Sequence, residues 1–324
     1  MRISRGFLAA AALACALLAG CARHSARPGA AAPARLTLPL DAGWRFLQSD
    51  APGAEQAAFD DSGWRSVDVP HDWAISGPFD PKSPAKGEGA FLPAGIGWYR
   101  RHLSSDPSYA GRRVFIEFDA VMANSDVWVN GVLLGHRPYG YASFAYELTG
   151  HLAAGGENVI AVRVDNSRQV AARWYTGSGI IRHVRLLAED PVHVGRHATF
   201  VTVPEISDAR AVVHVHTTVV NESAAAASVA VRMGLAGPDG GACGEAAAPE
   251  SGQREIAAGQ SADFDADITV ATPLRWDIGR PALYSASVRV ESGGRVVDED
   301  AASFGIREAR FEPATGFWLN GRNV

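Results

Sequence analysis

Short stretches of alternating apolar and polar residues make up much of the chain after its first 35 residues. In 159–165, apolar side chains at every second position fall on one face of an extended strand, as in a half-buried antiparallel sheet. The same alternation appears in further short runs, at 114–119, 127–134, 229–235, 264–270 and 284–290. From Val192 on, no run has helical periodicity. The pattern predicts an all-β protein.

A β-hairpin is predicted in the middle of the first half. Val127-Trp128-Val129 suits a pleated strand, Asn130-Gly131 supplies the positive φ angles of a tight turn, and the apolar run 132–134 returns.

An aromatic loop follows the hairpin, with Tyr139, Tyr141, Phe144 and Tyr146 set among glycine and proline. Two interpretations are open for these rings. They close the end of a sandwich core, or they form a flat platform that binds carbohydrate.

Composition divides the chain in two. The length of 324 residues exceeds what one core usually serves. Aromatic residues are frequent up to about 190, whereas short Ala- and Val-rich strands broken by Gly/Pro turns follow Val192. The second part therefore predicts a β-sandwich of immunoglobulin size. Within the first part we expect Trp64, Phe118 and Trp128 to be core residues, because each is placed on a strand.

The first 21 residues read as a targeting segment and not as part of the fold. Arg2 and Arg5 precede an apolar run, 7–18, that is too short to span a bilayer. The sequence Leu18-Ala19-Gly20-Cys21 resembles the bacterial lipobox, in which the signal is cut before a cysteine that then carries lipid. An ordinary secretory signal is the alternative.

A lipidated Cys21 would place the protein in the bacterial cell envelope, with the Ala- and Pro-rich stretch 22–35 as a tether. Ala22 after the cysteine favours the outer membrane or its periplasmic face over the inner membrane.

Charge and cysteines exclude several classes of partner. The net charge is −5 and no basic block occurs, so neither nucleic acid nor an anionic membrane surface is indicated, and a neutral ligand fits better. Cys243 lacks a disulfide partner within the mature chain. His214 and His216 share one strand face without a nearby Cys or carboxylate in the sequence. We therefore expect both histidines to face solvent and not to bind a metal ion. No cofactor is expected.

Three long motifs together resemble glycoside hydrolase family 2, the family of β-galactosidases, β-glucuronidases and β-mannosidases. They are FDDSGWRSVDVPHDW at 59–73, the hairpin with its GYASF continuation at 118–144, and RWYTGSGIIRHV at 173–184. The resemblance implies a galactose-binding-like jelly-roll β-sandwich followed by an immunoglobulin-like β-sandwich. The implied organisation is a lipoprotein signal at 1–21, a linker at 22–35, the sugar-binding jelly roll at 36–190, the immunoglobulin-like sandwich at 191–305 and the start of a (β/α)₈ barrel at 306–324.

The resemblance also implies which residues rim the substrate. These candidates are His71, Asp72, Trp73, Arg173, Trp174 and Tyr175. The commonest family members have an acidic residue where this chain has Arg173.

Catalytic residues are not found in this sequence. The family uses two glutamates at the ends of barrel strands, and neither motif is present here. Asp72, Glu88 and Asp119 are expected to be loop or strand-end caps. Asn320-Gly321 predicts one more hairpin turn, within a segment that resembles the family's linker into the barrel.

The expected function is therefore that of the non-catalytic N-terminal portion of a lipid-anchored family 2 glycosidase, with β-galactosidase as the first choice. A β-galactoside is the expected substrate, through the barrel, and the sequence does not indicate an oligomeric state. One alternative is a stand-alone surface lipoprotein that binds carbohydrate without hydrolysing it. A structural adaptor, in which both sandwiches hold another protein, is the third possibility.

Overall fold

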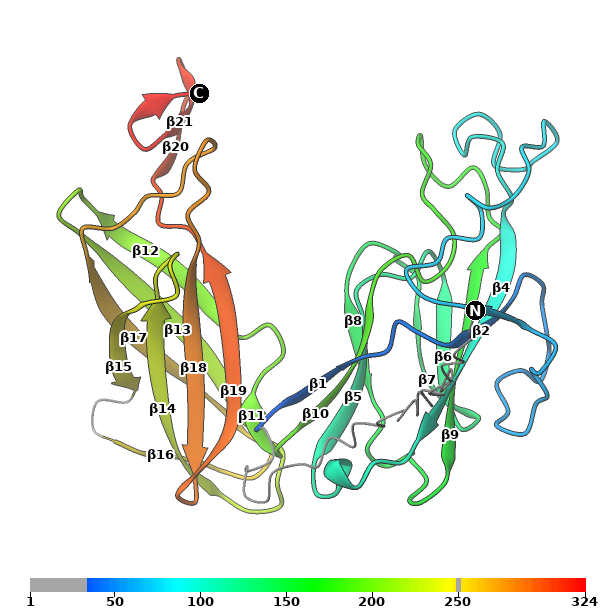
Figure 1. Ribbon diagram of the computed structural model, residues 1–324, viewed down its shortest axis with the longest axis horizontal. Coiled ribbons are helices and arrows are strands. Elements are labelled where there is room, and N and C mark those ends of the chain that lie inside the picture. The colour runs from blue at the N-terminus through cyan, green and yellow to red at the C-terminus, as the bar shows by residue number, and fades with distance from the viewer. Residues whose placement is uncertain (1–33, 249–251) are drawn as a thin grey trace, which may run out of the picture. The chain divides into compact units, whose positions relative to one another are not determined.

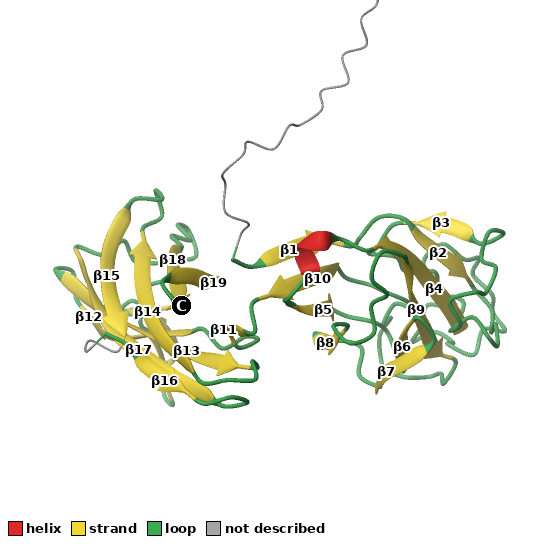
Figure 2. Ribbon diagram, turned by 90° about the horizontal axis from the view of Figure 1, so that it is seen from below, coloured by secondary structure: helices red, strands yellow, loops and turns green. Residues whose placement is uncertain are grey.

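The computed structural model describes residues 34–248 and 252–324 and contains two antiparallel β-sandwiches (Figure 1). Within these residues the only helical element is a short 3₁₀ turn, η1 (Pro107–Tyr109), so the all-β prediction is confirmed (Figure 2). No helix in this part of the chain is long and apolar enough to cross a membrane. Cys21 and the predicted signal lie outside the described residues, as does all but the end of the tether.

The first sandwich packs a four-stranded sheet against a six-stranded sheet. The smaller sheet has the order β1 (Leu36–Pro39), β10 (Val184–Glu189), β5 (Arg113–Phe118), β8 (Phe144–Glu147). The larger has the order β3 (Arg65–Val67), β2 (Trp44–Leu47), β4 (Gly95–Ser104), β9 (Glu157–Asn166), β6 (Ser125–Val129), β7 (Val132–Arg137).

The predicted hairpin is confirmed as β6 and β7. Asn130 and Gly131 form the turn with φ angles of 50° and 84°, the left-handed values that this residue pair tolerates. The Asn130 side chain also donates to the His151 carbonyl at 2.9 Å and to Asn158 Oδ1 at 2.8 Å. The turn is thereby held against neighbouring loops.

The core of this sandwich contains one of the three aromatic residues predicted for it. Phe118 is fully buried and stacks on Phe144 at 5.1 Å between ring centroids. Trp128 is on β6, but its neighbours Val127 and Val129 face the core, so the indole lies on the opposite face and is half-buried. Trp64 is also half-buried and precedes β3, which is shorter than the predicted strand 64–69. The core prediction for both tryptophans was wrong.

These tryptophans belong to a smaller apolar cluster on the outer face of the larger sheet. There Trp128 stacks on Trp98 at 5.3 Å, and Phe59 meets Trp64 edge to face. Ala161 is fully buried against the cluster, so the outer face of β9 is covered and not open to water as its alternation suggested.

A buried arginine holds the loop that covers this outer face. Arg100 on β4 is fully buried and its Nε donates to Asp61 at 2.7 Å. Its other nitrogens donate to loop carbonyls, among them those of Ala54 and Gln56. Charge pairing together with carbonyl acceptors compensates for the desolvation of the guanidinium.

Two rings of the aromatic loop pack with the core, and two are exposed at the surface. Phe144 is 9% exposed and belongs to the core, and Tyr146 packs against it. Tyr139 and Tyr141 are 60% and 41% exposed, with their ring centroids 5.8 Å apart. Only these two rings are available to a ligand.

The second sandwich confirms the immunoglobulin-size prediction. In one sheet, β11 (Val192–Val194) and β12 (Phe200–Ile206) pair with one edge of β13 (Arg210–Asn221), and β17 (Ser261–Ala271) pairs with the other. The opposing sheet contains β15 (Ala242–Ala248), β14 (Ala227–Ala236), β18 (Tyr284–Ser292) and β19 (Arg295–Phe304), with β16 (Arg254–Ile256) also on β14. The alternating Val, Met and Leu of β14 fill the core.

His214 and His216 lie on the outer face of β13, as predicted. Tertiary pairing nevertheless brings carboxylates to them, because β17 is antiparallel to β13 and presents aspartates at the facing positions. The Nδ1 atoms of His214 and His216 lie 2.7 Å from Asp267 and 2.8 Å from Asp265. No group of three or more His, Cys, Asp or Glu side chains among the described residues is arranged to hold a metal ion.

The segment 306–324 contains a small three-stranded sheet, β20 (Ala309–Glu312), β21 (Gly316–Leu319) and β22 (Arg322–Asn323). The Asn320-Gly321 turn joins the last two strands, with φ angles of 49° and 76°. The side-chain Nδ2 of Asn320 donates to the Trp276 carbonyl at 2.9 Å, and the Arg307 guanidinium lies over the Trp276 ring. The C-terminal sheet is thus tied to a loop of the second sandwich.

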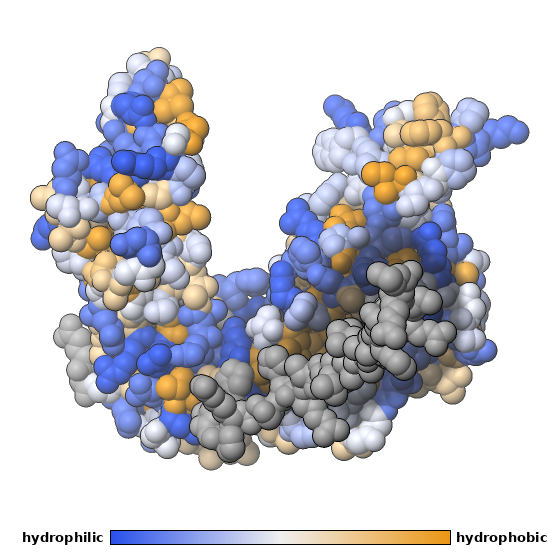
Figure 3. All heavy atoms as spheres, in the orientation of Figure 1, coloured by the Kyte–Doolittle hydropathy of each residue, from blue (hydrophilic) through white to orange (hydrophobic). Residues whose placement is uncertain are grey.

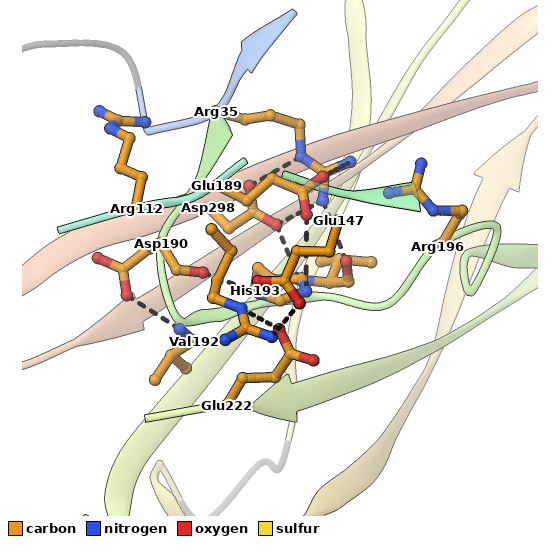
Figure 4. Close-up of polar contacts among 12 residues, drawn as sticks. Arg35, Arg112, Glu147, Glu189, Asp190, Val192, His193, Arg196, Glu222 and Asp298 are labelled. Atoms are coloured by element: carbon orange, nitrogen blue, oxygen red, sulfur yellow. Dashed lines mark hydrogen bonds and ion pairs between the residues drawn. The ribbon is translucent and has the colours of Figure 1, made fainter. Parts of the chain in front are cut away.

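A buried carboxylate organises the polar contacts where β10 leads into β11 (Figure 4). Asp298 is fully buried and accepts from Arg35 Nε at 3.0 Å, Arg35 Nη2 at 2.7 Å and the Val194 amide at 2.7 Å. Glu189 lies 3.5 Å from Arg35 Nη1, and burial raises the pKa of its carboxyl. Arg35, just before β1, therefore contacts both Glu189 on β10 and Asp298 on β19.

Candidate functional site

The residues proposed from sequence as the substrate rim converge at one end of the first sandwich. The His71 amide donates to the Ile180 carbonyl at 2.8 Å, and the Trp73 amide to the Ser178 carbonyl at 3.0 Å. Met122 and Gly179 exchange two further backbone hydrogen bonds, each of 2.8 Å. Segments far apart in the sequence thus form one small ladder beyond the ends of the strands.

Asp72 serves this ladder as an acceptor. Its Oδ1 accepts from the amides of Ser178 at 2.9 Å and Ala74 at 3.0 Å, and its Oδ2 accepts from the Tyr175 hydroxyl. Because both oxygens are occupied within the protein, Asp72 holds the segment 175–178 in place. That agrees with the cap role expected for it and leaves little capacity for a substrate contact.

Asn166 fixes the same segment from the other side. It is 5% exposed, and its Nδ2 donates to the Gly177 carbonyl at 3.0 Å and to Ser178 Oγ at 2.8 Å. Its carbonyl and Oδ1 accept from Gln169 Nε2 at 3.2 and 3.0 Å. The loop 167–176 is therefore anchored at both ends.

Gly179 is required at the centre of the ladder. Its φ is 122°, and a Cβ built there would lie 2.2 Å from Tyr99 Oη and 2.6 Å from the His71 carbonyl oxygen. Any side chain at this position would therefore displace the Tyr99 hydroxyl and the backbone at His71.

His71 is a neutral side chain with both ring nitrogens in use. Nε2 lies 2.9 Å from Arg65 Nη2, and Nδ1 lies 2.8 Å from Tyr99 Oη. Arginine can only donate, so Nε2 accepts and Nδ1 carries the proton that it donates to Tyr99. Burial, followed by the Arg65 charge, lowers the pKa of His71 to about 4. Burial also raises the pKa of Tyr99, which keeps its hydroxyl protonated.

Trp73 does not belong to the rim, and this part of the prediction was wrong. Its ring is 1% exposed, and it stacks on Phe46 at 5.7 Å. The residue follows a strand end, as the sequence suggested, but its pairing with 178 turns the indole into the core.

Arg173 and Trp174 are the two predicted rim residues that project into solvent. Arg173 is exposed and Trp174 is 63% exposed. Tyr175, next to them, is half-buried and bonded to Asp72, and burial followed by that hydrogen bond raises its pKa. Arg173 and Trp174 thus directly precede a residue, Tyr175, that is fixed by its hydrogen bond to Asp72.

Further exposed apolar side chains at this end were missed from sequence. They come from the Pro/Gly-rich stretch 75–94, and Ile75 and Phe79 are 67% and 74% exposed. Figure 3 shows apolar surface over these loops. Loops 74–94 and 166–178 enclose a cavity of about 10 Å³ between them, too small for a sugar ring. A ligand here would bind to the surface of the loops.

The other two carboxylates expected to be caps are Asp119 and Glu88. Asp119 is bonded to Arg185 through two hydrogen bonds of 2.7 Å, so it is an ion-pair partner as well as a strand-end residue. Glu88 is exposed in the loop 75–94.

Comparison with known proteins identifies the family. The family model for the sugar binding domain of glycosyl hydrolases family 2 matches residues 38–190, and the model "Glycosyl hydrolases family 2" matches residues 192–307. The chain belongs to glycosyl hydrolase family 2. The two matched regions correspond to the first and second sandwiches, so the jelly roll and immunoglobulin-like fold predicted from sequence are confirmed.

Some relatives are named as β-galactosidases and others as β-glucuronidases. The chain is 42% identical over 285 residues to the β-galactosidase BoGH2A of Bacteroides ovatus, covering 88% of this chain and 33% of that protein. It is 35% identical over 286 residues to a putative β-glucuronidase of Formosa agariphila, covering 87% of this chain and 26% of that protein. The chain therefore spans about a third or less of the length of these relatives.

Solved structures agree with this assignment. A family 2 member from Bacteroides cellulosilyticus superimposes with a TM-score of 0.83 at 31% identity, over 89% of this chain and 37% of that one. A β-glucuronidase from family 2 gives a TM-score of 0.82 at 28% identity, over 90% of this chain and 32% of that one.

Proposed function

We propose that the chain is the non-catalytic N-terminal part of a family 2 β-galactosidase. The observation that carries this proposal is the combination of both family 2 modules with a loop site whose carboxylate, Asp72, is occupied by internal donors. The 42% identity to a β-galactosidase favours galactosides. The named β-glucuronidases among the relatives make glucuronide the competing specificity.

Hydrolysis would require chemistry that the two sandwiches do not supply. A retaining glycosidase needs an acid/base and a nucleophile, two carboxyls about 5–5.5 Å apart across the scissile bond. Asp72 accepts from Tyr175 and Asp119 pairs with Arg185, so both carboxylates have structural partners within the first sandwich. In this proposal the barrel implied by the family supplies both carboxyls.

The first sandwich would contribute contacts at the edge of the substrate. Trp174 offers an indole face for stacking against the C–H face of a sugar, and Arg173 offers hydrogen-bond donors. Because one sugar buries little surface on an open loop, these contacts alone should bind a monosaccharide only in the millimolar range.

Activity assays on two polypeptides test the proposal. The purified 324-residue chain should release no nitrophenol above buffer from nitrophenyl β-galactoside, β-glucuronide or β-mannoside. A polypeptide expressed from the genomic reading frame through and beyond codon 324 should hydrolyse the β-galactoside fastest. Turnover by the shorter chain that is lost in Asp72→Asn would contradict the proposal.

A second candidate is a surface protein that binds carbohydrate without cleaving it. The exposed Tyr139 and Tyr141 rings and the exposed Trp174 indole favour this function, since each can stack on a sugar. A stop codon after codon 324 together with binding on a glycan array would select it over the glycosidase.

We also propose that the protein is lipid-anchored in the cell envelope. The support is the LAGC sequence ending at Cys21 and the Ala- and Pro-rich stretch that follows. Cys21→Ser should give a product that stays in the aqueous phase on detergent partitioning, or that is unprocessed. Detergent partitioning equal to that of the parent would contradict lipidation.

A further inference from the structure

The loop between β9 and β10 has a local charge that differs from that of the whole chain. The chain contains 35 acidic and 30 basic residues, for a net charge of −5. The stretch 167–182 contains Arg168, Arg173 and Arg182 and no Asp or Glu. Within the described residues these three arginines are exposed, and no carboxylate forms an ion pair with any of them. With three arginines and no acidic residue, this stretch has a local charge of +3 on a chain whose net charge is −5.

The carboxylates nearest to this loop bind other partners. Asp165, the nearest in sequence, accepts from Arg163 at 3.4 Å and from Ser167 at 3.1 and 2.6 Å. Asp72, which lies against the other end of the loop, accepts from Tyr175 and Ser178. Neither carboxylate forms an ion pair with Arg168, Arg173 or Arg182 among the described residues, so these guanidinium groups are available to an anion.

The loop is also anchored at both ends by hydrogen bonds within the protein. Gln169 is bonded to Asn166, and Tyr175 is bonded to Asp72, so the residues between them project from two fixed ends. Arg173 and Trp174 lie in this projecting part. Anchored ends reduce the conformational entropy that the loop loses on binding, which strengthens a weak surface contact.

From these observations we propose that the 167–176 loop recognises an anionic group, a carboxylate or a sulfate ester, on a glycan. Arg173 would bind the anion, since a guanidinium matches the planar oxygens of carboxylate and the oxygens of sulfate through paired N–H donors. Trp174 would stack on the sugar that carries it. Arg168, on the same loop, would add long-range attraction. This inference rests on the proposed function and deepens it, because it names a charged glycan where the net charge of the chain favoured a neutral one.

Titration of the chain with three tetrasaccharides of equal length tests the inference. One contains glucuronate, one contains sulfated galactose and one contains neutral galactose, and binding is followed by the NMR signal of the Trp174 indole at low and high salt. We expect at least one anionic saccharide to bind about fivefold or more tighter than the neutral one at low salt, which is the size expected for an exposed charge pair, and to lose this advantage at high salt.

Variants separate charge from stacking and from non-specific effects. Arg173→Gln should remove the preference for the anionic saccharide. Trp174→Ala should weaken the binding of all three saccharides to a similar extent. Arg289→Gln changes the net charge equally but lies on β18 of the second sandwich, so it should leave the preference unchanged.

The outcomes assign or reject the site. A preference for one anion identifies carboxylate or sulfate as the ligand, and equal preference for both indicates recognition of charge alone. Equal binding of all three saccharides, a preference that survives Arg173→Gln, or no binding at all would overturn the inference. None of these results affects the separate assay of nitrophenyl β-galactoside by the longer polypeptide, which tests the proposed function.

Discussion

The Tyr175 hydroxyl donates a hydrogen bond to the Asp72 carboxylate, joining residues 103 positions apart in the chain. Asp72 belongs to the VPHDW motif and Tyr175 to the RWYTGSGI motif. The two strongest sequence motifs of the first sandwich are therefore halves of one structural unit, in which an internal acceptor fixes the loop that presents Arg173 and Trp174.

Removing that hydroxyl should destabilise the loop more than it destabilises the core. Tyr175→Phe removes one donor to a charged acceptor, for which a loss of about 1.5–3 kcal/mol in the free energy of unfolding is usual. We expect a lower urea midpoint and a changed NMR signal of the Trp174 indole. Tyr141→Phe, at an exposed tyrosine, is the matched control and should change neither. An identical Trp174 indole signal in Tyr175→Phe and the parent would show that the loop keeps its conformation without this bond.

At Gly179, the absence of a side chain allows the neighbouring segments to approach closely. Gly179→Ala would place a Cβ 2.2 Å from Tyr99 Oη in addition to the strain of its positive φ, so we expect a loss of several kcal/mol or failure to fold. Gly63→Ala is the control, because a Cβ there meets nothing within 4 Å and should change the melting temperature little. Similar melting temperatures for both variants would contradict the ladder described around Gly179.

Sequence periodicity predicted the strands well because alternation reports directly on which face of a sheet is buried. It failed for Trp128, since a strand pattern cannot say whether the second face is covered by a loop. Here the loop 51–61, held by the buried Arg100, covers that face and gives Trp128 and Trp64 apolar neighbours. Arg100 holds this loop by pairing with Asp61 and by donating to the carbonyls of Ala54 and Gln56, and these long-range contacts are not indicated by any local pattern.

Two substitutions compare the main core with this outer cluster. Phe118→Ala removes a fully buried ring and should cost about 3–5 kcal/mol. Trp128→Ala removes a half-buried ring that stacks on Trp98, so we expect a smaller loss of about 1–2 kcal/mol. Denaturant unfolding of both variants measures the difference. A larger loss for Trp128 than for Phe118 would mean that the outer cluster is the stronger determinant of stability.

The candidate site was predicted less completely than the fold. The motifs located its segments, and Arg173 and Trp174 are exposed as a rim requires. Trp73 was misplaced because pairing of its backbone with Ser178, 105 positions later, decides which way its ring points. Arg65 on β3 and Tyr99 on β4 bind the two ring nitrogens of His71 and could be found only from the tertiary structure.

Stability should also depend on pH through His102 on β4. Its Nε2 lies 2.9 Å from Asp61 and its Nδ1 lies 3.0 Å from Glu157. Burial by itself would lower the pKa of His102, but the hydrogen bonds to Asp61 and Glu157 outweigh burial and raise the pKa above its usual 6.5. A base whose folded pKa is raised stabilises the fold fully below the unfolded pKa, and this stabilisation is lost as the pH rises through the folded pKa.

His102→Gln isolates this contribution from that of His71, whose pKa is lowered to about 4 and whose effect has the opposite sign, appearing as the pH falls below 6.5. We expect the parent to be more stable than His102→Gln at about pH 6 and the two to converge by about pH 9, as measured by urea midpoints across that range. Asp61 remains bonded to Arg100 in the variant, so the loop should keep its position and the comparison should report the imidazole charge alone. A stability difference that stays constant from pH 6 to 9 would show that His102 acts through packing and not through its proton.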